Sequence, residues 1–436
     1  MANVLLTTRC NLKCPYCFAQ EKLGDGQKLT ISLSDIEKVI GFLKRSNHPY
    51  FRAMGGEPTL HPDFTRIMQM ALENDMHFDL LSNATWPDHF NEIFQRVSPR
   101  RMDFLLNIDH PSRYAFQTWE RIERNLAAIS EPGNVTLSFN IFERVPDYEY
   151  LIELTRKYSI NKMRMSLSLP VVGANNACLT LEDHKTMAPA VIEIVRRAED
   201  VGVQVRMDNA IPLCMFNNEQ AGELLLKGVI DLQRNLRCGP VIDIGPDLRV
   251  WCCFCLSSMW NRHLDEFQNL EEIYTFYRSA MGLYQSRLYP LAECESCHHR
   301  ELWNCQGGCL AYTVAKHGEL SPQQCVQQPD SDGWKPRALL DWSPDVRIRR
   351  YDMPKASCEI FNKLSGMEVD ASFQPLLDAL NGQHSASEIV DRYIGSLHNA
   401  KINSDLEAIT QTVMRQSANE LLLGMLHQGF LVEREN

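Results

Sequence analysis

Short apolar runs alternate with amphipathic stretches from residue 3 to about residue 209. The runs have the length of buried strands, and the stretches between them gather their apolar residues on one helical face. Such an alternation is typical of strand and helix units arranged around a parallel sheet. The expected strands are Val4–Leu6, Phe51–Met54, Phe78–Leu81, Asp103–Ile108, Val135–Ile141, Lys162–Leu167 and an additional Val203–Met207.

Helix signals fill the segments between these strands. Ser34 and Glu37 form a capping-box pattern at the start of one helix, Pro62 opens the next, and a long helix is expected near residues 181–200. Six units of this kind predict an α/β fold in the form of a partial (β/α)6 barrel. In such barrels the reactive groups lie at the carboxyl ends of the strands, so we expect the site there.

The alternation stops after the barrel. Residues 212–330 are rich in cysteine, glycine and proline and contain few long periodic segments, so we expect metal to stabilise this part more than a packed core does. A connector rich in Pro, Asp and Arg follows residue 331. The pattern predicts three domains, 1–211, 212–330 and 331–436.

Helical patterns return in the last domain. Phe373–Leu380 has helical spacing, Ser385 and Glu388 make a second capping box, and Leu421–His427 has the pattern of a helix, followed by the apolar run that begins at Phe430. A short array of helices that ends in a strand is typical of a small winged-helix module.

Composition narrows the classes of function. The chain has 436 residues, of which 44% are hydrophobic and 23% charged, as in an ordinary globular protein. Its net charge of -11 disfavours nucleic acid as a partner, because that mode of binding needs a basic surface. The start of the chain shows no export signal, and no apolar stretch has the length of a membrane span. We therefore expect a cytoplasmic protein that binds neither nucleic acid nor membranes.

The 15 cysteines are unevenly distributed. Three lie within residues 10–17, ten lie between residues 214 and 325, and Cys178 and Cys358 stand apart. Thiols in a reducing compartment are kept reduced, so clustered cysteines there more often bind metal than form disulfides. We expect Cys178 and Cys358 to be buried apolar residues and the clusters to hold metal.

The first cluster, Cys10, Cys14 and Cys17, follows the first expected strand and offers three thiolates within eight residues. A fully ligated 4Fe-4S cluster needs four cysteines, so three leave one iron open for a cofactor or substrate. The alternative is a zinc knuckle, but such zinc sites close with a fourth Cys or His nearby. The incomplete set therefore favours iron and sulfur.

This Cys-x3-Cys-x2-Cys loop, with Tyr16 before its last cysteine, resembles the radical S-adenosylmethionine (SAM) superfamily. The resemblance implies that the open iron is chelated by SAM. It also implies that the run Gly55, Gly56, Glu57 and Pro58, which follows the second expected strand, binds the amino group of SAM. Glu57 would accept a hydrogen bond from the ammonium, and the glycines would let the backbone come close. On its own, this run would be a plain turn.

Polar residues at later strands extend the expected cofactor site by the same resemblance. Ser82 and Asn83 end the third strand, Asn140 lies at the end of the fifth, and Arg164 lies on the sixth. For each, the alternative is a polar residue that satisfies loop backbone at a strand end. Asp109, which closes the fourth strand, is the one candidate for a catalytic group, without an assigned proton-transfer role.

The second cysteine region resembles the SPASM extension of radical SAM enzymes, which binds two auxiliary 4Fe-4S clusters. Asp247–Cys253 occupies the place of that family's Asp-Gly-x-Val-Tyr-Pro-Cys run, so Cys253 is the expected ligand. Leu248 replaces the family's glycine and Cys252 its proline, which leaves the choice between Cys252 and Cys253 open.

The resemblance also implies crossed ligation of the auxiliary clusters. The nearer cluster would be held by Cys238, Cys253 and Cys309, and the farther one by Cys294, Cys297, Cys305 and Cys325. Family members often place the fourth ligand of the nearer cluster shortly before the first motif cysteine, where this chain has Leu232. Cys214 is the preferred substitute, with Cys255 or an open iron as alternatives.

The last domain resembles the peptide-recognition module of ribosomal peptide maturases, which binds a leader peptide by adding a strand. From Asp341 to Asn436 the chain has 14 acidic and 9 basic residues, which disfavours a winged helix that binds DNA. The resemblance as a whole implies an oxidoreductase that reductively cleaves SAM to a 5'-deoxyadenosyl radical, which abstracts a hydrogen from a ribosomally synthesised precursor peptide. The product would be a cross-link, a thioether, an epimer or an oxidised side chain, and flavodoxin or ferredoxin would donate the electron.

Two alternatives remain at this point. The enzyme could be a radical dehydrogenase or epimerase of a small metabolite, such as a sugar or an antibiotic intermediate. The last domain could be a plain interaction or capping domain, because a fold does not by itself imply a function.

Overall fold

The computed structural model describes residues 2–19, 29–131, 133–231, 235–301, 305–318, 339–342, 347–351, 357–361, 366–370, 373–397 and separate positions between 414 and 434. Contacts divide the chain into two units. The first comprises Met1–Tyr277 and Tyr289–Lys316, and the second comprises Arg278–Leu288 and His317–Asn436.

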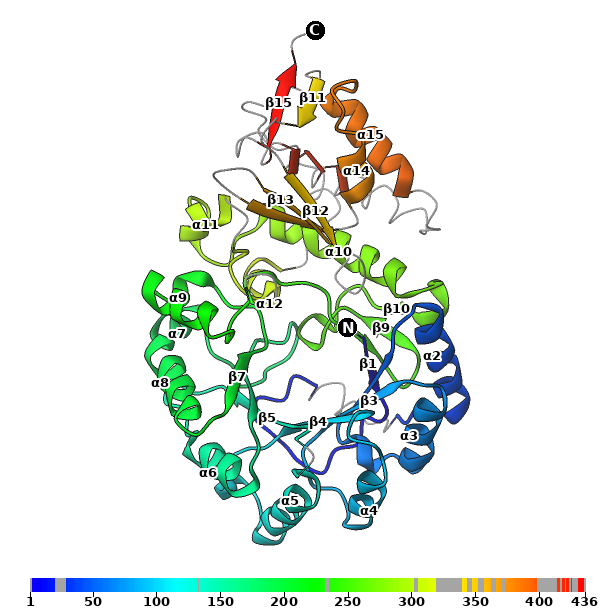
Figure 1. Ribbon diagram of the computed structural model, residues 1–436, viewed down its shortest axis with the longest axis vertical. Helices are drawn as coiled ribbons and strands as arrows, with labels where there is room; N and C mark the ends of the chain where they lie inside the picture. Colours follow the sequence, from blue (N-terminus) through cyan, green and yellow to red (C-terminus); the bar gives the residue numbers. More distant parts are fainter. Residues whose placement is uncertain are drawn as a thin grey trace. The chain divides into compact units, whose positions relative to one another are not determined.

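A curved sheet of ten strands forms the centre of the first unit (Figure 1), in the order β10-β9-β8-β1-β2-β3-β4-β5-β6-β7. Neighbours from β1 to β7 pair in parallel and in chain order, because each crossover returns the chain to the same edge of the sheet. These strands are β1 (Ala2–Leu5), β2 (Tyr50–Met54), β3 (His77–Ser82), β4 (Met102–Asn107), β5 (Val135–Ile141), β6 (Lys162–Leu167) and β7 (Gln204–Met207). The predicted α/β fold with a parallel sheet is confirmed.

Helices follow these strands and lie on the outer side of the sheet (Figure 1). They are α2 (Leu33–Arg45), α3 (Phe64–Glu73), α4 (His89–Gln95), α5 (Phe116–Ile129), α6 (Glu149–Tyr158), α7 (Leu181–Thr186) and α8 (Ala188–Glu199). Short 3-10 turns occur at η1 (Pro58–Leu60), η2 (Pro111–Arg113), η3 (Leu213–Met215), η4 (Phe254–Leu256), η5 (Leu264–Glu266) and η6 (Ala292–Cys294).

Two details of the predicted helices are wrong. The first helix is capped by Ser32, whose hydroxyl accepts from the Asp35 N–H, two residues before the predicted capping box. The helix predicted near 181–200 is split at Met187 into α7 and α8, with Pro189 in the first turn of α8. A proline has no N–H to donate, so it is tolerated in a first turn and not in a helix interior.

The cysteine-rich part is more regular than its sequence indicates. It contains α9 (Asn218–Leu226), β8 (Ile242–Ile244), β9 (Arg249–Trp251), β10 (Arg262–His263), α10 (Leu270–Arg287), α11 (His298–Glu301) and α12 (Leu310–His317). Strand β8 pairs in parallel with β1 and extends the main sheet. Ile242 and Val250 are fully buried, so a packed core contributes to the stability of this part. That metal stabilises it more than the core does stays a prediction.

The second unit contains two antiparallel sheets. β11 (Leu339–Trp342) pairs with β15 (Leu431–Arg434), and β12 (Arg347–Tyr351), β13 (Ser357–Phe361) and β14 (Gly366–Asp370) form a three-stranded sheet. The predicted connector therefore contains four strands. They were not predicted because they are short and several of their residues are charged.

Helices α14 (Gln374–Asp378) and α15 (Ala386–Leu397) complete the described part of this unit, and the predicted capping box between Ser385 and Glu388 is present. Leu376, Tyr393 and Phe430 are buried in its core. Its assignment as a winged helix stays a prediction, as do the three domain boundaries.

Among the described residues, no helix has the combination of length and apolarity that crossing a bilayer requires.

Candidate functional site

The loop that carries Cys10, Cys14 and Cys17 begins directly after β1, at the carboxyl edge of the sheet. Cys17 N–H donates to the Cys14 carbonyl at 3.1 Å, which folds the end of the loop into a turn. The Cys10 thiol accepts from the backbone N–H groups of Asn11 and Leu12. Amide donors aimed at a sulfur are typical of cysteines that ligate an iron-sulfur cluster.

Burial raises the pKa of all three thiols. For Cys14 the pKa rises to about 12, mainly through burial and further through the nearby Cys17 and Asp109. A thiol must be deprotonated to bind metal, so loading this loop releases protons.

The two glycines after β2 lie against the backbone of this loop. Gly56 N–H donates to the Thr7 carbonyl at 2.8 Å. A Cβ on Gly56 would lie 2.3 Å from the Arg9 oxygen and 2.9 Å from the Cys10 Cβ, and a Cβ on Gly55 would lie 2.7 Å from the Thr7 oxygen. Only residues without a side chain allow this approach, so the glycines first serve to seat the cysteine loop.

Glu57 is fully buried, and its carboxylate is surrounded by donors from the chain. It accepts from the Thr59 hydroxyl at 2.7 Å, from the Ser82 hydroxyl at 2.8 Å and from the Asn83 N–H at 2.9 Å. The family resemblance implies that a cofactor ammonium donates to this carboxylate. In the structure its donors belong to the chain itself, and they tie the end of β2 to the end of β3. Pro58 begins the turn η1 that supplies two of them from Thr59.

Asn83 connects this network to the cysteine loop. Its side-chain amide donates to the Asn11 oxygen at 3.0 Å, and Asn11 donates to the Thr85 hydroxyl at 2.8 Å. The Cys10 thiol also accepts a hydrogen bond from Asn83. Glu57, Ser82 and Asn83 therefore position the loop between the first two cysteines.

Tyr16 is buried and begins a second polar chain. Its hydroxyl accepts from the Asn107 amide at 3.0 Å, and the Asn140 amide donates to the Asn107 oxygen at 2.5 Å. Residues at the ends of β4 and β5 thus reach the cysteine loop. Asn107, which closes β4 at the predicted site, links Tyr16 to Asn140.

Asp109 lies beside the same loop. Burial raises the pKa of its carboxyl, and the Arg113 guanidinium, with its Nε at 3.4 Å, opposes the rise. The Asp109 N–H donates to the Tyr114 hydroxyl at 2.7 Å. These contacts hold Asp109 near Cys14, and its role stays a prediction.

Arg164 lies deeper in the barrel than the other predicted cofactor residues. On the sheet it pairs with Ser138, two residues before Asn140 on β5. Its guanidinium forms an ion pair with Asp208. Asp208 directly follows β7, so Arg164 has a partner on the neighbouring strand's carboxyl end.

The second cysteine region contains two groups of thiols. Cys253 and Cys309 each hydrogen-bond to Cys255, and Cys309 also bonds to Cys238. Cys214 instead interacts with Cys294, Cys297 and Cys305, away from the group that the sequence assigns to it. Cys325 lies outside the described residues.

Leu248 supports the register proposed for this region. It has a φ of 59°, in the left-handed region where glycine is favoured, at the position where the family pattern has glycine. Cys253 then follows β9 as the expected ligand.

The two cysteine regions are in contact. The rings of Phe18, which follows Cys17, and Phe254, which precedes Cys255, have centroids 4.8 Å apart. The segment after β6 joins the same two loops, since Ala177 N–H donates to the Pro15 carbonyl and Val172 N–H to the Cys255 carbonyl, both at 2.9 Å.

Comparison with known families decides the nature of the first loop. A family model described as the radical SAM superfamily matches residues 4–142, which contain the three cysteines and the glycine run. Residues 4–142 therefore form a radical SAM domain. Domains of this family bind SAM and a 4Fe-4S cluster, and the three thiols with their amide donors suit such a cluster.

Curated relatives share parts of this domain. The chain is 32% identical over 208 residues to Fe-coproporphyrin III synthase of Methanosarcina barkeri, 45% of this chain and 52% of that protein. It is 33% identical over 87 residues to 7,8-dihydro-6-hydroxymethylpterin dimethyltransferase of Methanocaldococcus jannaschii, 19% of this chain and 17% of that one. It is 36% identical over 66 residues to GTP 3',8-cyclase of Shewanella denitrificans, 15% and 20% of the two chains. The chain thus spans about half or less of the length of these relatives.

A solved structure resembles more of the chain. Streptococcus suis SuiB bound to precursor peptide SuiA superimposes with a TM-score of 0.53 over 71% of each chain, at 16% identity. At that identity the likeness concerns the fold alone. The superimposed region is longer than the radical SAM domain.

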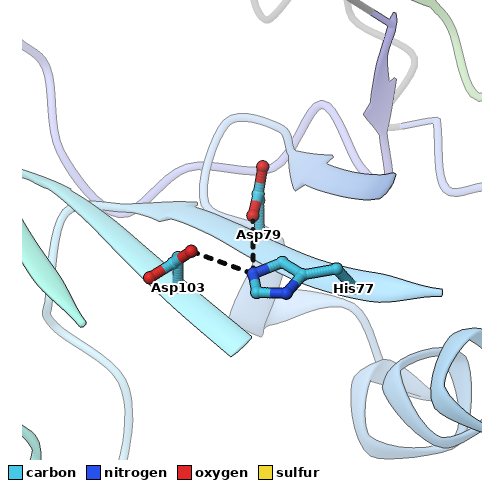
Figure 2. Close-up of side chains that lie close together, drawn as sticks. All are labelled: His77, Asp79 and Asp103. Carbon is cyan, nitrogen blue, oxygen red and sulfur yellow. Dashed lines mark hydrogen bonds and ion pairs between the residues drawn. The ribbon is translucent and has the colours of Figure 1, made fainter. Parts of the chain in front are cut away.

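A charged cluster at the opposite end of the strands was missed by sequence reasoning. His77 Nε2 lies 2.9 Å from an Asp103 oxygen and 3.4 Å from an Asp79 oxygen (Figure 2). Asp79 also pairs with Arg52 at 3.1 Å. His77 begins β3 and Ser82 ends it, so the cluster lies roughly 17 Å along the strand from the Glu57 network. The sequence does contain a signal for this cluster, because His77 and Asp79 occupy alternate positions of the strand β3.

Proposed function

We propose that this chain is a radical SAM enzyme that modifies a ribosomally synthesised precursor peptide. The observation that carries the proposal is the likeness to SuiB over 71% of both chains, because that structure contains a precursor peptide. The radical SAM domain supplies the reaction type, and the likeness beyond it supports the substrate class.

When bound, SAM and a reduced 4Fe-4S cluster supply a carbon radical that takes a hydrogen atom from the substrate. Cys10, Cys14 and Cys17 would hold the cluster. The backbone at Gly55 and Gly56 would lie beside the methionine part of SAM, while its packing on the loop keeps the cysteines in place.

The remaining polar residues orient the site. Glu57 fixes the ends of β2 and β3 through Ser82 and Asn83. Asn140 and Tyr16, joined through Asn107, would align the nucleoside part of SAM at the ends of β4 and β5. Such fixed dipoles act without reorganisation when the reaction occurs.

Asp109 is the one charged candidate beside this site. Its raised pKa, caused by burial, would favour a role in accepting or holding a proton near the substrate. Two auxiliary 4Fe-4S clusters in the second cysteine region would take up the electron when the product is oxidised.

The second unit would recognise the peptide. The three-stranded antiparallel sheet β12-β13-β14 has β12 and β14 as its outer strands. An extended peptide adds to such a sheet edge through main-chain hydrogen bonds. Leader binding at this sheet would hold the core peptide at the enzyme while the radical site acts on it.

A second candidate is supported by the curated relatives. Their names describe enzymes of GTP, a pterin and a porphyrin, which are small molecules. A radical enzyme of a small metabolite would share the SAM site and differ in the role of the second unit.

Anaerobic assays with the full chain distinguish the two candidates. The reconstituted enzyme, SAM and dithionite are incubated with short peptides encoded near the gene, or with a panel of sugars and nucleotides. The expected result is 5'-deoxyadenosine formation stimulated by one peptide, with a mass change in that peptide. The variant lacking Cys10, Cys14 and Cys17 should show neither, and a leader-scrambled peptide should react poorly.

Hydrogen exchange on the same mixtures tests the binding mode. The peptide should protect amides of β12 or β14 in the full chain. Stimulation by a small metabolite, with no peptide that protects either strand, would overturn the peptide proposal and favour the second candidate.

A further inference from the structure

Eight of the nine thiols between residues 214 and 309 fall into two sets of four, and the sets differ from those that the family pattern implies. The resemblance leaves the fourth ligand of the nearer cluster open and draws Cys325 into the farther one. The three-dimensional arrangement offers a different partition.

The first set is a continuous chain of thiols. Hydrogen bonds join Cys238 to Cys309, Cys309 to Cys255 and Cys255 to Cys253. These residues come from three separate segments, the stretch before β8, the turn after β9 and the residue before α12. Four thiols from three segments at one point are the donor set of a complete 4Fe-4S cluster.

Backbone donors point at this set. The Cys253 sulfur accepts from the N–H groups of Cys255 and Leu256, and the Cys238 sulfur accepts from the Leu310 N–H at the start of α12. Hydrogen bonds of this kind stabilise cluster sulfurs, and a helix N-terminus favours the negative charge of a thiolate.

Cys252 lies at the end of this chain of thiols. It hydrogen-bonds to Cys253, while its own carbonyl accepts from Val241 N–H at 2.9 Å and continues the pairing of β8 with β9. The neighbouring Cys255 instead bridges Cys253 and Cys309. Position therefore favours Cys255 over Cys252 as the fourth member.

The second set gathers around Cys305. Leu213 N–H and Gly307 N–H both donate to the Cys305 sulfur, at 3.4 Å and 3.3 Å. Cys214 follows Leu213 and interacts electrostatically with Cys305, Cys294 and Cys297.

Two glycines make this second arrangement possible. Gly307 and Gly308 have φ values of 82° and 86°, and a Cβ on either would lie within 3.0 Å of Pro290 or Pro212. The loop can therefore pack between these prolines only with glycine at both positions. The packing brings the Cys305 loop to the segment that carries Cys214.

We propose that Cys238, Cys253, Cys255 and Cys309 ligate one auxiliary 4Fe-4S cluster and that Cys214, Cys294, Cys297 and Cys305 ligate the other. Each cluster is then complete with four cysteines, so neither keeps an open iron for the peptide, and both serve electron transfer. Cys325 is not required. The inference rests on the proposed function in one respect, the presence of two auxiliary clusters.

The test uses the full chain with Cys10, Cys14 and Cys17 replaced by alanine, which leaves the auxiliary clusters alone. After anaerobic reconstitution this parent should hold about eight irons per chain, by the count of two 4Fe-4S clusters. Serine variants of single cysteines are then compared in pairs. Cys255→Ser is matched with Cys252→Ser, and Cys214→Ser with Cys178→Ser and Cys325→Ser.

Iron content and the EPR spectrum of the reduced protein are the readouts. Cys255→Ser and Cys214→Ser should each lose up to about four irons or shift the spectrum of one cluster. Cys252→Ser, Cys178→Ser and Cys325→Ser should keep the iron and the spectrum of the parent. Circular dichroism checks that each variant folds.

Two results would overturn the inference. If Cys252→Ser loses iron and Cys255→Ser does not, Cys255 is not a ligand of the first cluster. If Cys325→Ser loses iron and Cys214→Ser does not, Cys214 is not a ligand of the second. A parent without iron would instead refute the auxiliary clusters and that part of the proposed function. A crystal structure of the reconstituted wild-type chain gives the same answer without substitutions, since iron must lie bonded to the sulfurs of Cys255 and Cys214.

Discussion

Replacing Gly56 by alanine tests how the glycine run supports the radical SAM site. The new Cβ would lie 2.3 Å from the Arg9 oxygen and 2.9 Å from the Cys10 Cβ. Non-bonded carbon atoms rest about 3.5–4.0 Å apart, so the cysteine loop must move by roughly 1 Å. Gly56 is not in the left-handed region, so its effect arises from close approach and not from backbone conformation.

The expected cost has two sources. Overpacking of this kind costs about 1–3 kcal/mol. The movement also disturbs the bonds from Gly56 N–H to Thr7 O at 2.8 Å and from Glu57 N–H to Arg9 O at 2.7 Å, each worth about 0.5–1.5 kcal/mol. We expect Gly56→Ala to lower the free energy of unfolding by about 2–6 kcal/mol.

Urea unfolding under anaerobic conditions measures this loss, and iron counting measures the cluster. Gly56→Ala should also lose about four irons, because the shifted loop no longer presents its three thiols together. Gly41→Ala is the control, since its Cβ on α2 would meet only the Arg45 Nη1 at 3.6 Å. That change should stabilise the chain by about 0.5–1 kcal/mol. A Gly56→Ala protein with full iron and a stability within about 0.5 kcal/mol of the parent would refute the reasoning.

Three further predictions concern buried charges. Glu57→Gln places an amide NH2 against the donors from Thr59, Ser82 and Asn83, and it should lower the free energy of unfolding in urea by about 2–4 kcal/mol. An unchanged urea midpoint would count against this hydrogen-bond network. Burial raises the pKa of Asp243 to about 8 in the folded protein. The contribution of protonated Asp243 to the free energy of unfolding is therefore fully present below about pH 4 and is lost as the pH rises through 8. Asp243→Asn keeps the acceptor for the Asn3 amide at 2.7 Å, and its free energy of unfolding should rise relative to that of the parent between pH 5 and 8. If the difference between variant and parent stays constant over this range, the raised pKa of Asp243 is refuted. Arg52→Met removes the 3.1 Å ion pair of the half-buried Asp79 and should cost about 2–3 kcal/mol, whereas the double variant with Asp79→Leu should recover most of it in a double-mutant cycle.

Local patterns were sufficient for the seven parallel strands of the barrel and for the first cysteine loop. β5 and β6 have the predicted bounds, because their apolar residues alternate with polar ones at the period of a strand. The spacing of Cys10, Cys14 and Cys17 is itself local, so it identified the radical SAM domain before any contact was known.

Local patterns failed where competing local signals were equal. Both Ser32 and Ser34 are followed three residues later by an acidic residue, and only packing of Ile36 and Val39 against the sheet selects the start of α2. The strands between residues 339 and 370 are short and charged, and their pairing with each other and with β15 stabilises them.

By itself, the sequence determined the parallel α/β barrel and the three-cysteine loop after its first strand, because strand periodicity and ligand spacing are encoded within a few residues. Only the tertiary structure decided that Glu57 faces the chain, that Arg52 pairs with Asp79, and that Cys214 and Cys255 join opposite groups of thiols. These contacts join distant segments, as Leu213 N–H and the Cys305 sulfur do across 92 residues. Such pairs depend on how the whole barrel closes around them, and no short stretch of sequence specifies that.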